Sequence, residues 1–388
     1  MRSSNHFRIA VLPGDGIGKE VMSACVEVLD TIQRKVGGFK LDLEYIDAGA
    51  EYFLEQGVDI TEEAMGKVKQ ADAILLGAMG LQDVRLPNGT EIAPHLKIRT
   101  ELGLFAGVRP VKAYPNTPQR LADARSQEID FVVLRESTEG LFAEREKGVI
   151  LEDREARDTM VITRQTCENL FDFAFKLSRR RKQKGGKGRV TCVDKSNVLR
   201  SMVFFRKIFD ERASLFPDLQ SDHNYVDAQA LDLIRRPWEF DVLVMENMFA
   251  DILSDLGGGL VGGMGMAPCA EIGLKHGLFQ PAHGSAPDIM GKDLANPTAM
   301  FLSAAMMLEW LGQKYQNESL LNAAGLPESK IEEGFRLKRT QPKEFGGPHG
   351  CSKHNGLIPD KEGFYSGAKM IMRNPINHPI PQLSDLDW

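Results

Sequence analysis

The segment Asn247–Asp255 (NMFADILSD) holds two carboxylates that can bind a metal ion. Asp251 and Asp255 lie four residues apart in a helical pattern, so both side chains extend from one face of the helix. Neighbouring carboxylates repel each other, and a hard cation such as Mg²⁺ or Mn²⁺, which prefers oxygen ligands, relieves that repulsion. On its own, this spacing more often marks a helix cap and a solvated charge, so it indicates a metal site without establishing one.

Four cationic side chains lie close to predicted element boundaries. Lys195 follows the apolar run Val190–Val193, and ligands bind at the carboxyl ends of strands in α/β sheets. The other three are Arg99, Arg109 and Arg135. Arginine can pair with a carboxylate through two parallel hydrogen bonds, which suits a di-acid substrate. Surface lysines and arginines are common, so none of the four establishes a site by itself.

The segment Leu12–Gly18 (LPGDGIG) is a glycine-rich turn after the first predicted strand. Its glycines fall as GxGxG rather than GxGxxG, and no acidic residue ends a second strand about twenty residues later. We therefore interpret it as a turn, not as a Rossmann dinucleotide site.

Short apolar runs alternate with amphipathic helical stretches along the chain. Runs that are apolar at nearly every position are typical of strands covered on both faces, and their alternation with helices predicts an α/β fold with crossover connections. The predicted strands are Arg8–Leu12, Leu41–Ile46, Ala73–Leu76, Phe131–Leu134, Val190–Val193 and Val242–Met245. The predicted helices are Lys19–Lys35, Cys167–Lys182, Val198–Glu211, Asp227–Arg235 and Pro297–Lys314.

The composition is that of a soluble globular protein, with 42% apolar and 26% charged residues. Its 388 residues suffice for one large domain or two ordinary ones. A net charge of −6 argues against a protein built mainly to bind nucleic acid or an anionic membrane. No apolar run approaches the roughly 20 residues that span a bilayer, and the polar start predicts no signal peptide. Five scattered cysteines without CxxC spacing favour reduced thiols and a cytoplasmic location.

Two stretches differ in composition from the rest. Arg179–Arg189 (RRRKQKGGKGR) is strongly basic, but it lacks interleaved aromatic residues, which favours a solvated helix end over a polyanion-binding patch. Gln341–Asp360 is rich in Gly, Pro and His, and His349, Cys351 and His354 can in principle bind a metal. Because a fourth ligand and a recognised spacing are missing, we predict an ordered surface loop there.

Six segments occur in the order and approximate spacing of one protein family. Through them the chain resembles the isocitrate/isopropylmalate dehydrogenase family of β-decarboxylating dehydrogenases, most closely its 3-isopropylmalate dehydrogenase branch. The resemblance covers roughly residues 8–347. The segments are LPGDGIGKEV, LFAGVRP, VDKSNVL, NMFADILSD, HGSAPDI and LANPTAMFLSAAMML.

The resemblance implies a two-domain α/β fold that is not a Rossmann fold, in an intertwined homodimer with shared active sites. Residues 1–103 and 263–388 would form a discontinuous cofactor-binding domain. Residues 104–262 would form the substrate and dimerisation domain. After Gly347 the chain is longer than is usual in the family and carries no assigned motif.

The resemblance also implies oxidation of the hydroxyl of a malate-type dicarboxylic acid, with NAD and Mg²⁺ or Mn²⁺, followed by loss of CO₂. Lys195 and Asp227 would be the catalytic pair that relays the proton away, and both would come from the partner subunit. The metal ligands match Asp227, Asp251 and Asp255, and the residues that bind the substrate carboxylates match Arg99, Arg109 and Arg135.

The loop His283–Ile289 matches the family's adenosine-binding loop. Asp288 stands where NADP-preferring members tend to carry a lysine. A carboxylate there can accept hydrogen bonds from both ribose hydroxyls and would repel a 2′-phosphate, so NAD is predicted. The predicted cofactor-binding residues are His283, Gly284, Ser285, Ala286, Asp288, Asn197 and, near the adenine, Asn296.

The chain departs from the family pattern at Phe142. The family's RExTxxxY pattern carries a tyrosine that reprotonates the enol after decarboxylation, whereas this chain reads RESTEGLF. Phenylalanine cannot donate a proton. Oxidation should therefore survive the change, while efficient decarboxylation is in question.

A second departure lies in the segment Ile92–Arg99 (IAPHLKIR), which matches the helix that reads the substrate's variable group. Ala93 and His95 stand where isocitrate readers have Ser and Asn, which disfavours isocitrate. Isopropylmalate readers usually have an apolar pair, of which Leu96 fits one half and His95 does not fit the other. His95 either bonds a polar 3-substituent, as in tartrate, or is a neutral wall of the pocket.

Three kinds of function compete. The first hypothesis is an enzyme that oxidises 3-isopropylmalate, as in leucine biosynthesis, with a D-malate- or tartrate-type substrate as the alternative. A non-catalytic regulatory subunit is the second; Phe142 supports it, and the intact metal, lysine and arginine positions oppose it. Nucleic-acid binding through the basic run is the third, and it is disfavoured.

Overall fold

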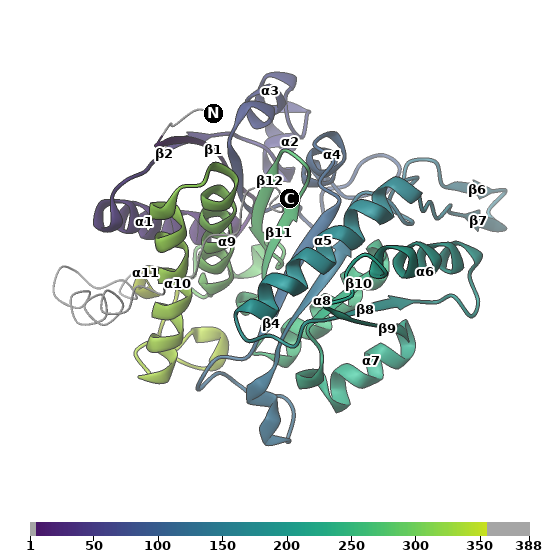
Figure 1. Cartoon of the computed structure of the whole chain (residues 1–388). Coiled ribbons are helices and arrows are strands. Elements are labelled where there is room, and N and C mark those ends of the chain that lie inside the picture. The colour runs from purple at the N-terminus through teal and green to yellow at the C-terminus, as the bar shows by residue number, and fades with distance from the viewer. Residues whose placement is uncertain (1–4, 355–388) are drawn as a thin grey trace.

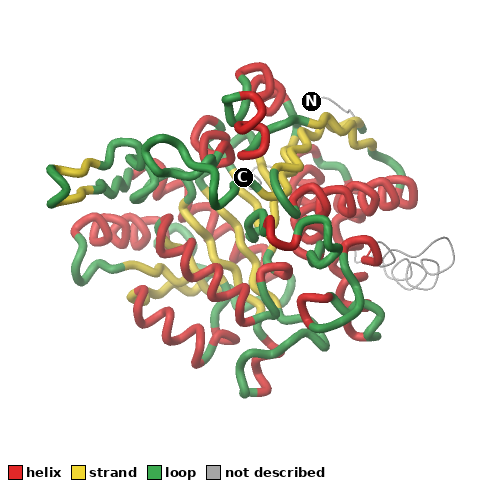
Figure 2. The backbone as a smooth tube through the Cα atoms, turned by 180° about the vertical axis from the view of Figure 1, so that it is seen from behind, coloured by secondary structure: helices red, strands yellow, loops and turns green. Residues whose placement is uncertain are grey.

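The computed structural model describes residues 5–354; residues 1–4 and 355–388, which fall in the predicted cofactor-binding segments, lie outside the described part. A ten-stranded sheet runs through the middle of the molecule, and helices cover both of its faces (Figure 1). A separate hairpin of β6 (Val149–Leu151) and β7 (Glu155–Arg157) projects from the body (Figure 2). This architecture confirms the predicted α/β class.

The sheet consists of β1 (His6–Gly14), β2 (Lys40–Tyr45), β3 (Ala73–Ala78), β4 (Ala106–Lys112), β5 (Asp130–Glu136), β8 (Arg189–Asp194), β9 (Gln220–Tyr225), β10 (Val242–Met245), β11 (Pro268–Ile272) and β12 (Gly277–Pro281). In space they follow the order β2-β1-β3-β12-β11-β4-β5-β10-β8-β9. Strands from residues 104–262 form one continuous half, and the flanking parts of the chain supply the other. The halves coincide with the two predicted domain segments, while the division into separate domains stays a prediction.

The two halves of the sheet are mainly parallel and meet in an antiparallel centre. β1 pairs in parallel with β2 and β3, and β10 pairs in parallel with β5 and β8. At the centre, β11 is antiparallel to both β12 and β4, and β4 is antiparallel to β5. As predicted, the sheet therefore differs from the mostly parallel Rossmann sheet.

The helices are α1 (Gly18–Val36), α2 (Ala50–Gln56), α3 (Glu62–Gln70), α4 (Pro94–Glu101), α5 (Arg164–Gln183), α6 (Arg200–Ala213), α7 (Val226–Arg235), α8 (Asn247–Leu260), α9 (Thr298–Tyr315), α10 (Glu318–Arg336) and α11 (Cys351–His354). The six predicted strands and five predicted helices are all present, with each end within three residues of its predicted position. Within residues 5–354, no helix combines the length and apolarity needed to cross a membrane.

Alternating side chains along the strands feed cores on opposite faces of the sheet. On one face α1, α5, α6, α9 and α10 share a core that spans both halves, to which β5 contributes Val132 and Leu134. On the other face there are two cores: one under α3 and α4, and one under α7 and α8 that includes Phe131 and Val133. Because these two cores do not merge, the packed layer on this face is interrupted between α4 and α8.

The basic run Arg179–Arg189 lies at the C-terminal end of α5 and just beyond it. Ion pairs join Arg179 to Asp218, Arg181 to Asp130 and Asp241, and Lys184 to Glu309. The run is thus a helix end whose cations are largely paired, in agreement with the helix-end interpretation rather than with a free cationic patch.

The described part of Gln341–Asp360 is an ordered loop, as predicted. It contains the 3₁₀ turn η5 (Lys343–Phe345), and a β-bridge joins Pro342 to His349. The Cys351 side chain is buried, and its thiol donates to the Ala295 carbonyl. The cysteine therefore packs as a core residue; the side chain of His354 and residues 355–360 lie outside the described part.

Candidate active site

A cavity of about 930 Å³ lies on the interrupted face of the sheet, between α4 and α8. Strands β4 and β5 form its floor, and the loop after β12 closes one side. The predicted site residues that line it are His95, Leu96, Arg99, Arg109, Arg135, Asp251, Asp255, His283 and Gly284. The structure thus brings together all five predicted substrate-binding residues and two of the three predicted metal ligands.

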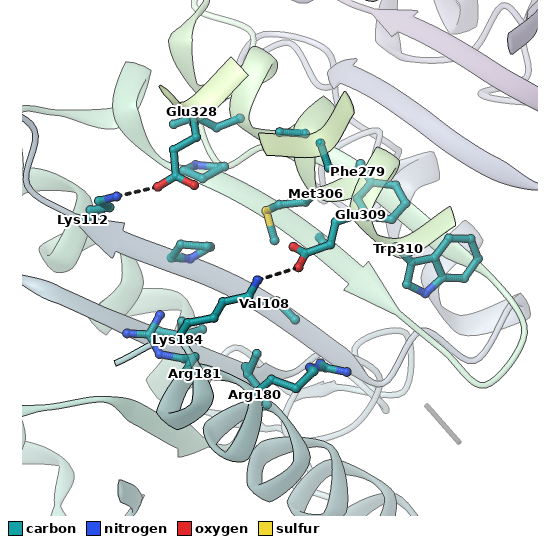
Figure 3. A pocket seen from close by; sticks show the side chains of 18 of the residues that line it. Val108, Lys112, Arg180, Arg181, Lys184, Phe279, Met306, Glu309, Trp310 and Glu328 are labelled. Carbon is teal, nitrogen blue, oxygen red and sulfur yellow. Dashed lines mark hydrogen bonds and ion pairs between the residues drawn. The ribbon is translucent and has the colours of Figure 1, made fainter. Parts of the chain in front are cut away.

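The other face of the same strands lines a second cavity, of about 360 Å³ (Figure 3). Lys112 of β4 pairs there with Glu328, and Lys184 pairs with Glu309. Val108 points into this second cavity, whereas Arg109, the next residue, points into the first. Because side chains alternate along β4, Arg109 lies on the face of the first cavity. The opposite face is mainly apolar, and its Lys112 and Lys184 are paired.

The arginine trio is buried at the floor and wall of the first cavity. Arg99, Arg109 and Arg135 expose only 4%, 6% and 3% of their surface. Burial and the neighbouring Arg109 and Arg99 lower the pKa of Arg135 to about 10. Contrary to the expectation that each arginine flanks an element boundary, Arg109 lies in the middle of β4. Three crowded, desolvated cations form a strong site for an anion.

Asp251 joins this cluster to the carboxylates of α8. Its Oδ1 accepts from Arg109 Nη1 at 3.4 Å and also from Arg135 Nη1. Arg109 further donates to Ser254 Oγ at 2.7 Å, and Arg135 Nε to Asn247 Oδ1 at 2.8 Å. One end of α8 therefore orients the two guanidinium groups.

Asp255 lies one helical turn beyond Asp251 and faces the same cavity. Burial raises the pKa of Asp255 above its ordinary value; Arg109 opposes the rise, and Asp251 adds to it. This unfavourable pair of oxygen donors is what a hard divalent cation would stabilise, so the residues fit the predicted metal. Within one chain, however, no three His, Cys, Asp or Glu side chains of the described residues come together as a metal site.

The predicted catalytic pair lies elsewhere in the same chain. Lys195 follows β8, Asp227 begins α7, and Lys195 Nζ donates to Asp227 Oδ1 at 2.6 Å. This bond from Lys195 lowers the pKa of Asp227. Neither residue lines the cavity that holds Asp251 and Asp255 in this chain. One copy therefore presents Lys195 and Asp227 together, but apart from the other two predicted metal ligands.

Helices and loops near Lys195 and Asp227 expose large apolar side chains. They are Val198 and Leu199 after β8, Val203 of α6, Leu231 and Ile234 of α7, and Ile252 of α8. Exposed apolar surface of this kind often marks a protein–protein contact. The loop that carries Lys195 also holds the predicted cofactor residue Asn197, which is exposed.

The predicted adenosine loop is anchored by the glycine-rich turn of β1. Ile17 N donates to the Ser285 carbonyl at 2.8 Å, and a Cβ on Gly16 would lie only 2.1 Å from that oxygen. The Ser285 hydroxyl in turn donates to the Gly80 carbonyl. The segment thus supports the loop, which is consistent with its interpretation as a turn. Residue 16 must be glycine because the two backbones meet there.

The predicted cofactor-binding residues of this loop and its neighbourhood differ in their exposure. His283 Nε2 is buried without a hydrogen-bond partner among the described residues, and burial lowers the pKa of this histidine. Ala286 adopts a left-handed conformation, with φ of 38°. Asp288, in the 3₁₀ turn η4 (Pro287–Ile289), is exposed. Asn296 is buried and donates to Glu344 Oε2 at 2.9 Å, which ties the C-terminal loop to this region.

Phe142 and His95 flank the arginines. The Arg135 guanidinium lies 5.4 Å from the centre of the Phe142 ring, within cation–π range. Burial, and after it the positive charge of the neighbouring Arg99, lowers the pKa of His95 to about 3, so the imidazole is neutral. Its Nδ1 is buried without a hydrogen-bond partner in the described part of the chain. A neutral imidazole keeps one acceptor nitrogen, so both roles proposed for His95 stay compatible with the structure.

One carboxylate that contacts the arginine trio was not predicted from the sequence. Glu271, in the middle of β11, is fully buried, and its Oε1 lies 2.9 Å from Arg99 Nη2. The short run PCAEI offers no local signal for it, because neither its length nor its spacing marks a site. Only the placement of β11 beside β4 brings Glu271 to the buried arginines.

Comparison with known proteins agrees with this arrangement. Residues 8–337 match the family model described as isocitrate/isopropylmalate dehydrogenase. The chain belongs to this family. A 3-isopropylmalate/3-methylmalate dehydrogenase of Methanocaldococcus jannaschii is 41% identical over 345 residues, which covers 88% of this chain and 94% of that protein. A 3-isopropylmalate dehydrogenase of Geobacillus kaustophilus is 42% identical over 315 residues, covering 78% and 82%.

Solved structures give the same result. The isocitrate dehydrogenase from Methylococcus capsulatus superposes with a TM-score of 0.78 at 32% identity, covering 91% of this chain and 98% of that one. A β-decarboxylating dehydrogenase from Thermococcus kodakarensis gives a TM-score of 0.70 at 32% identity, covering 91% and 95%. The predicted family and fold are confirmed, and the chain is a β-decarboxylating hydroxy-acid dehydrogenase of this family.

Proposed function

We propose that the enzyme oxidises 3-isopropylmalate with NAD and a divalent cation, and then decarboxylates the keto acid. The observation that carries this proposal is the buried arginine trio beside Asp251 and Asp255 in one cavity. The apolar part of the cavity, which includes Leu76, Met79 and Leu96, suits an isopropyl group. The names of the two curated relatives support the same substrate.

The chain's own residues bind and orient the substrate. Arg109 and Arg135 would exchange their contacts to Asp251 for bidentate bonds to a substrate carboxylate. Asp251 and Asp255, with Asp227 of a second copy, would hold the cation. Bound there, the cation would lower the pKa of the substrate hydroxyl. Bound NAD would accept the hydride.

Lys195 and Asp227 of the second copy would carry the proton. Their 2.6 Å bond supports this role, and the hydroxyl proton would leave through Lys195 and its carboxylate partner. When the β-keto acid then loses CO₂, the bond between C3 and the carboxylate breaks. Its electron pair forms an enolate, and C3 must later take up a proton.

We further propose a homodimer that shares its active sites, the use of NAD rather than NADP, and a cytoplasmic location. The exposed apolar side chains near Lys195 support the dimer, because a second copy would cover them. The exposed carboxylate of Asp288 supports NAD. The cysteines are all free and buried, which suits a reducing compartment.

A D-malate- or tartrate-type substrate is the second candidate, because the unpartnered Nδ1 of His95 favours a hydrogen-bonding group at C3. NADH formation with Mg²⁺ or Mn²⁺ distinguishes the candidates. The panel comprises 3-isopropylmalate, D-malate, tartrate and isocitrate, with NADP in parallel as the cofactor control. Fastest turnover of 3-isopropylmalate with NAD supports the first candidate. Preference for tartrate or malate supports the second, and no turnover of any acid contradicts both.

The Phe142→Tyr variant tests the decarboxylation step. In a single turnover of the native enzyme, NADH should appear before CO₂, because without a phenol to protonate C3 the enolate can recombine with the CO₂ still beside it, which delays net CO₂ release. The tyrosine should speed CO₂ release relative to NADH formation by about tenfold or more, since a positioned general acid contributes roughly 10²- to 10⁴-fold. Phe142→Leu is the control and should keep the lag. If CO₂ keeps pace with NADH in the native enzyme, another group supplies the proton.

A further inference from the structure

Glu271, Gly107 and Arg135 lie side by side on three adjacent strands. Glu271 of β11 is the register partner of Gly107 of β4, and Gly107 is the partner of Arg135 of β5. Directly opposed residues in a sheet point to the same face, so Glu271 and Arg135 both lie on the cavity side of the sheet, across a position without a side chain. A Cβ at Gly107 would lie 2.9 Å from Glu271 Oε2 and 2.7 Å from Ser137 Oγ, closer than real Cβ atoms approach. Glycine at 107 therefore makes room for the Glu271 carboxylate.

The Glu271 carboxylate is charged although it is fully buried. Burial alone would raise its pKa, but Arg99, Arg109 and Arg135 hold the pKa of Glu271 below its ordinary value. Its Oε1 pairs with Arg99 Nη2 at 2.9 Å, and its Oε2 has no hydrogen-bond partner among the described residues. A buried carboxylate in this position is stable only because cations surround it.

The contact divides the arginine trio. Arg109 and Arg135 face Asp251 of α8, which is half exposed at the mouth of the site. Arg99 is instead held from below by Glu271, and both partners are almost completely buried. Counted together, the three arginines, Asp251 and Glu271 leave one net positive charge, where the cluster without Glu271 would have two.

We propose that Glu271 sets the charge that the cavity accepts: its ion pair with Arg99 fixes that arginine on α4 and cancels one positive charge, so the site selects dicarboxylates of the malate type over tricarboxylates. This inference rests on the proposed function in that the cavity must bind a hydroxy acid. It makes Glu271 a positioning residue that determines specificity, acting through Arg99 without touching the reacting atoms.

A purely structural role for Glu271 predicts a different result. If the ion pair only fastened α4 to β11, its loss would loosen the cavity and weaken all acids alike. If it sets the charge, its loss must favour acids with a third carboxylate over acids with two. The ratio of the two affinities separates these cases, because a general loss of stability does not change it.

The experiment measures binding to the full-length protein by calorimetry in the presence of Mg²⁺, with D-malate as the dicarboxylate and isocitrate as the tricarboxylate. In Glu271→Gln, the ratio of the two dissociation constants should shift toward isocitrate by about tenfold or more, because one more positive charge remains in a poorly solvated pocket. Asp241→Asn is the matched control. Asp241 is also buried and pairs at 2.6 Å, but its partner is Arg181 and not one of the arginine trio, so this variant should keep the native ratio.

The double variant Arg99→Gln/Glu271→Gln provides a second test that avoids leaving one charge buried alone. It removes one charge of each sign, so the ratio of the dissociation constants for D-malate and isocitrate should return to within about threefold of the native ratio. Both acids should bind more weakly than to the native protein. Equal weakening of both acids in Glu271→Gln, or a double variant that shifts as far as the single one, would overturn the proposal. A native protein that binds neither these two acids nor 3-isopropylmalate would instead contradict the proposed function.

Discussion

Asp251→Asn is expected to reduce kcat for NADH formation by about 10³-fold, because Lewis-acid activation of the hydroxyl is worth several kcal/mol and about 4 kcal/mol corresponds to that factor. The substitution keeps the shape of the side chain and removes its charge. Asp251 lies at the boundary between the arginines and Asp255, so it is the carboxylate through which the predicted metal site and the substrate site meet.

Binding separates loss of chemistry from loss of structure. Asp251→Asn frees Arg109 and Arg135 from their anionic neighbour, so a dicarboxylate should still bind, while the concentration of Mg²⁺ needed for half-maximal rate should rise. Steady-state kinetics with varied Mg²⁺ and calorimetry with D-malate measure the two effects. Asp210→Asn, which alters an exposed carboxylate of α6, is the control and should leave both unchanged. A variant with native metal dependence would show that Asp251 does not bind the cation.

Strands that are buried on both faces could be predicted from the sequence because they leave a plain apolar run, whereas the exposed edge strand β9 was missed. β3, β8 and β10 are buried at nearly every position, and their apolar runs were identified with accurate limits. The central strands β4 and β11 were missed for the opposite reason. Each contains a charged residue, Arg109 or Glu271, on the cavity side of the sheet. The charged residues of the site therefore interrupt the apolar pattern by which a buried strand is recognised in a sequence.

The site shows the same limit. The spacing of Asp251 and Asp255 predicted their common face, because four residues make about one helical turn. No spacing along the chain predicts that Glu271 meets Arg99, since the pair is created by the register of β11 against β4. Nor does local sequence relate Asp227 to Asp251; only the family resemblance assigned both to one metal, and within a single copy the cavity of Asp251 does not include Asp227.

Lys195→Met is expected to reduce turnover by about 10³-fold, as for loss of a general acid–base group, but mixing it with a second inactive variant should restore activity. If each active site takes Lys195 and Asp227 from one copy and Asp251 and Asp255 from the other, a mixed dimer of Lys195→Met and Asp251→Asn contains one intact site. Random exchange of subunits between equal amounts of the two variants then yields about a quarter of native activity, since half the dimers are mixed and each has one working site.

The matched control mixes Lys195→Met with Asp227→Asn. These two residues are bonded to each other within one copy, so every site in a mixed dimer receives one damaged group and no activity should return. The measurement is the rate of NADH formation after the two variants are unfolded and refolded together, compared with each variant refolded alone. Recovery in the first mixture but not in the second requires that the Lys195–Asp227 pair of one copy serves the Asp251–Asp255 pair of the other. If neither mixture recovers although mixed dimers form, each chain builds its own site, and the 2.6 Å pair must then move to the cavity within a single copy.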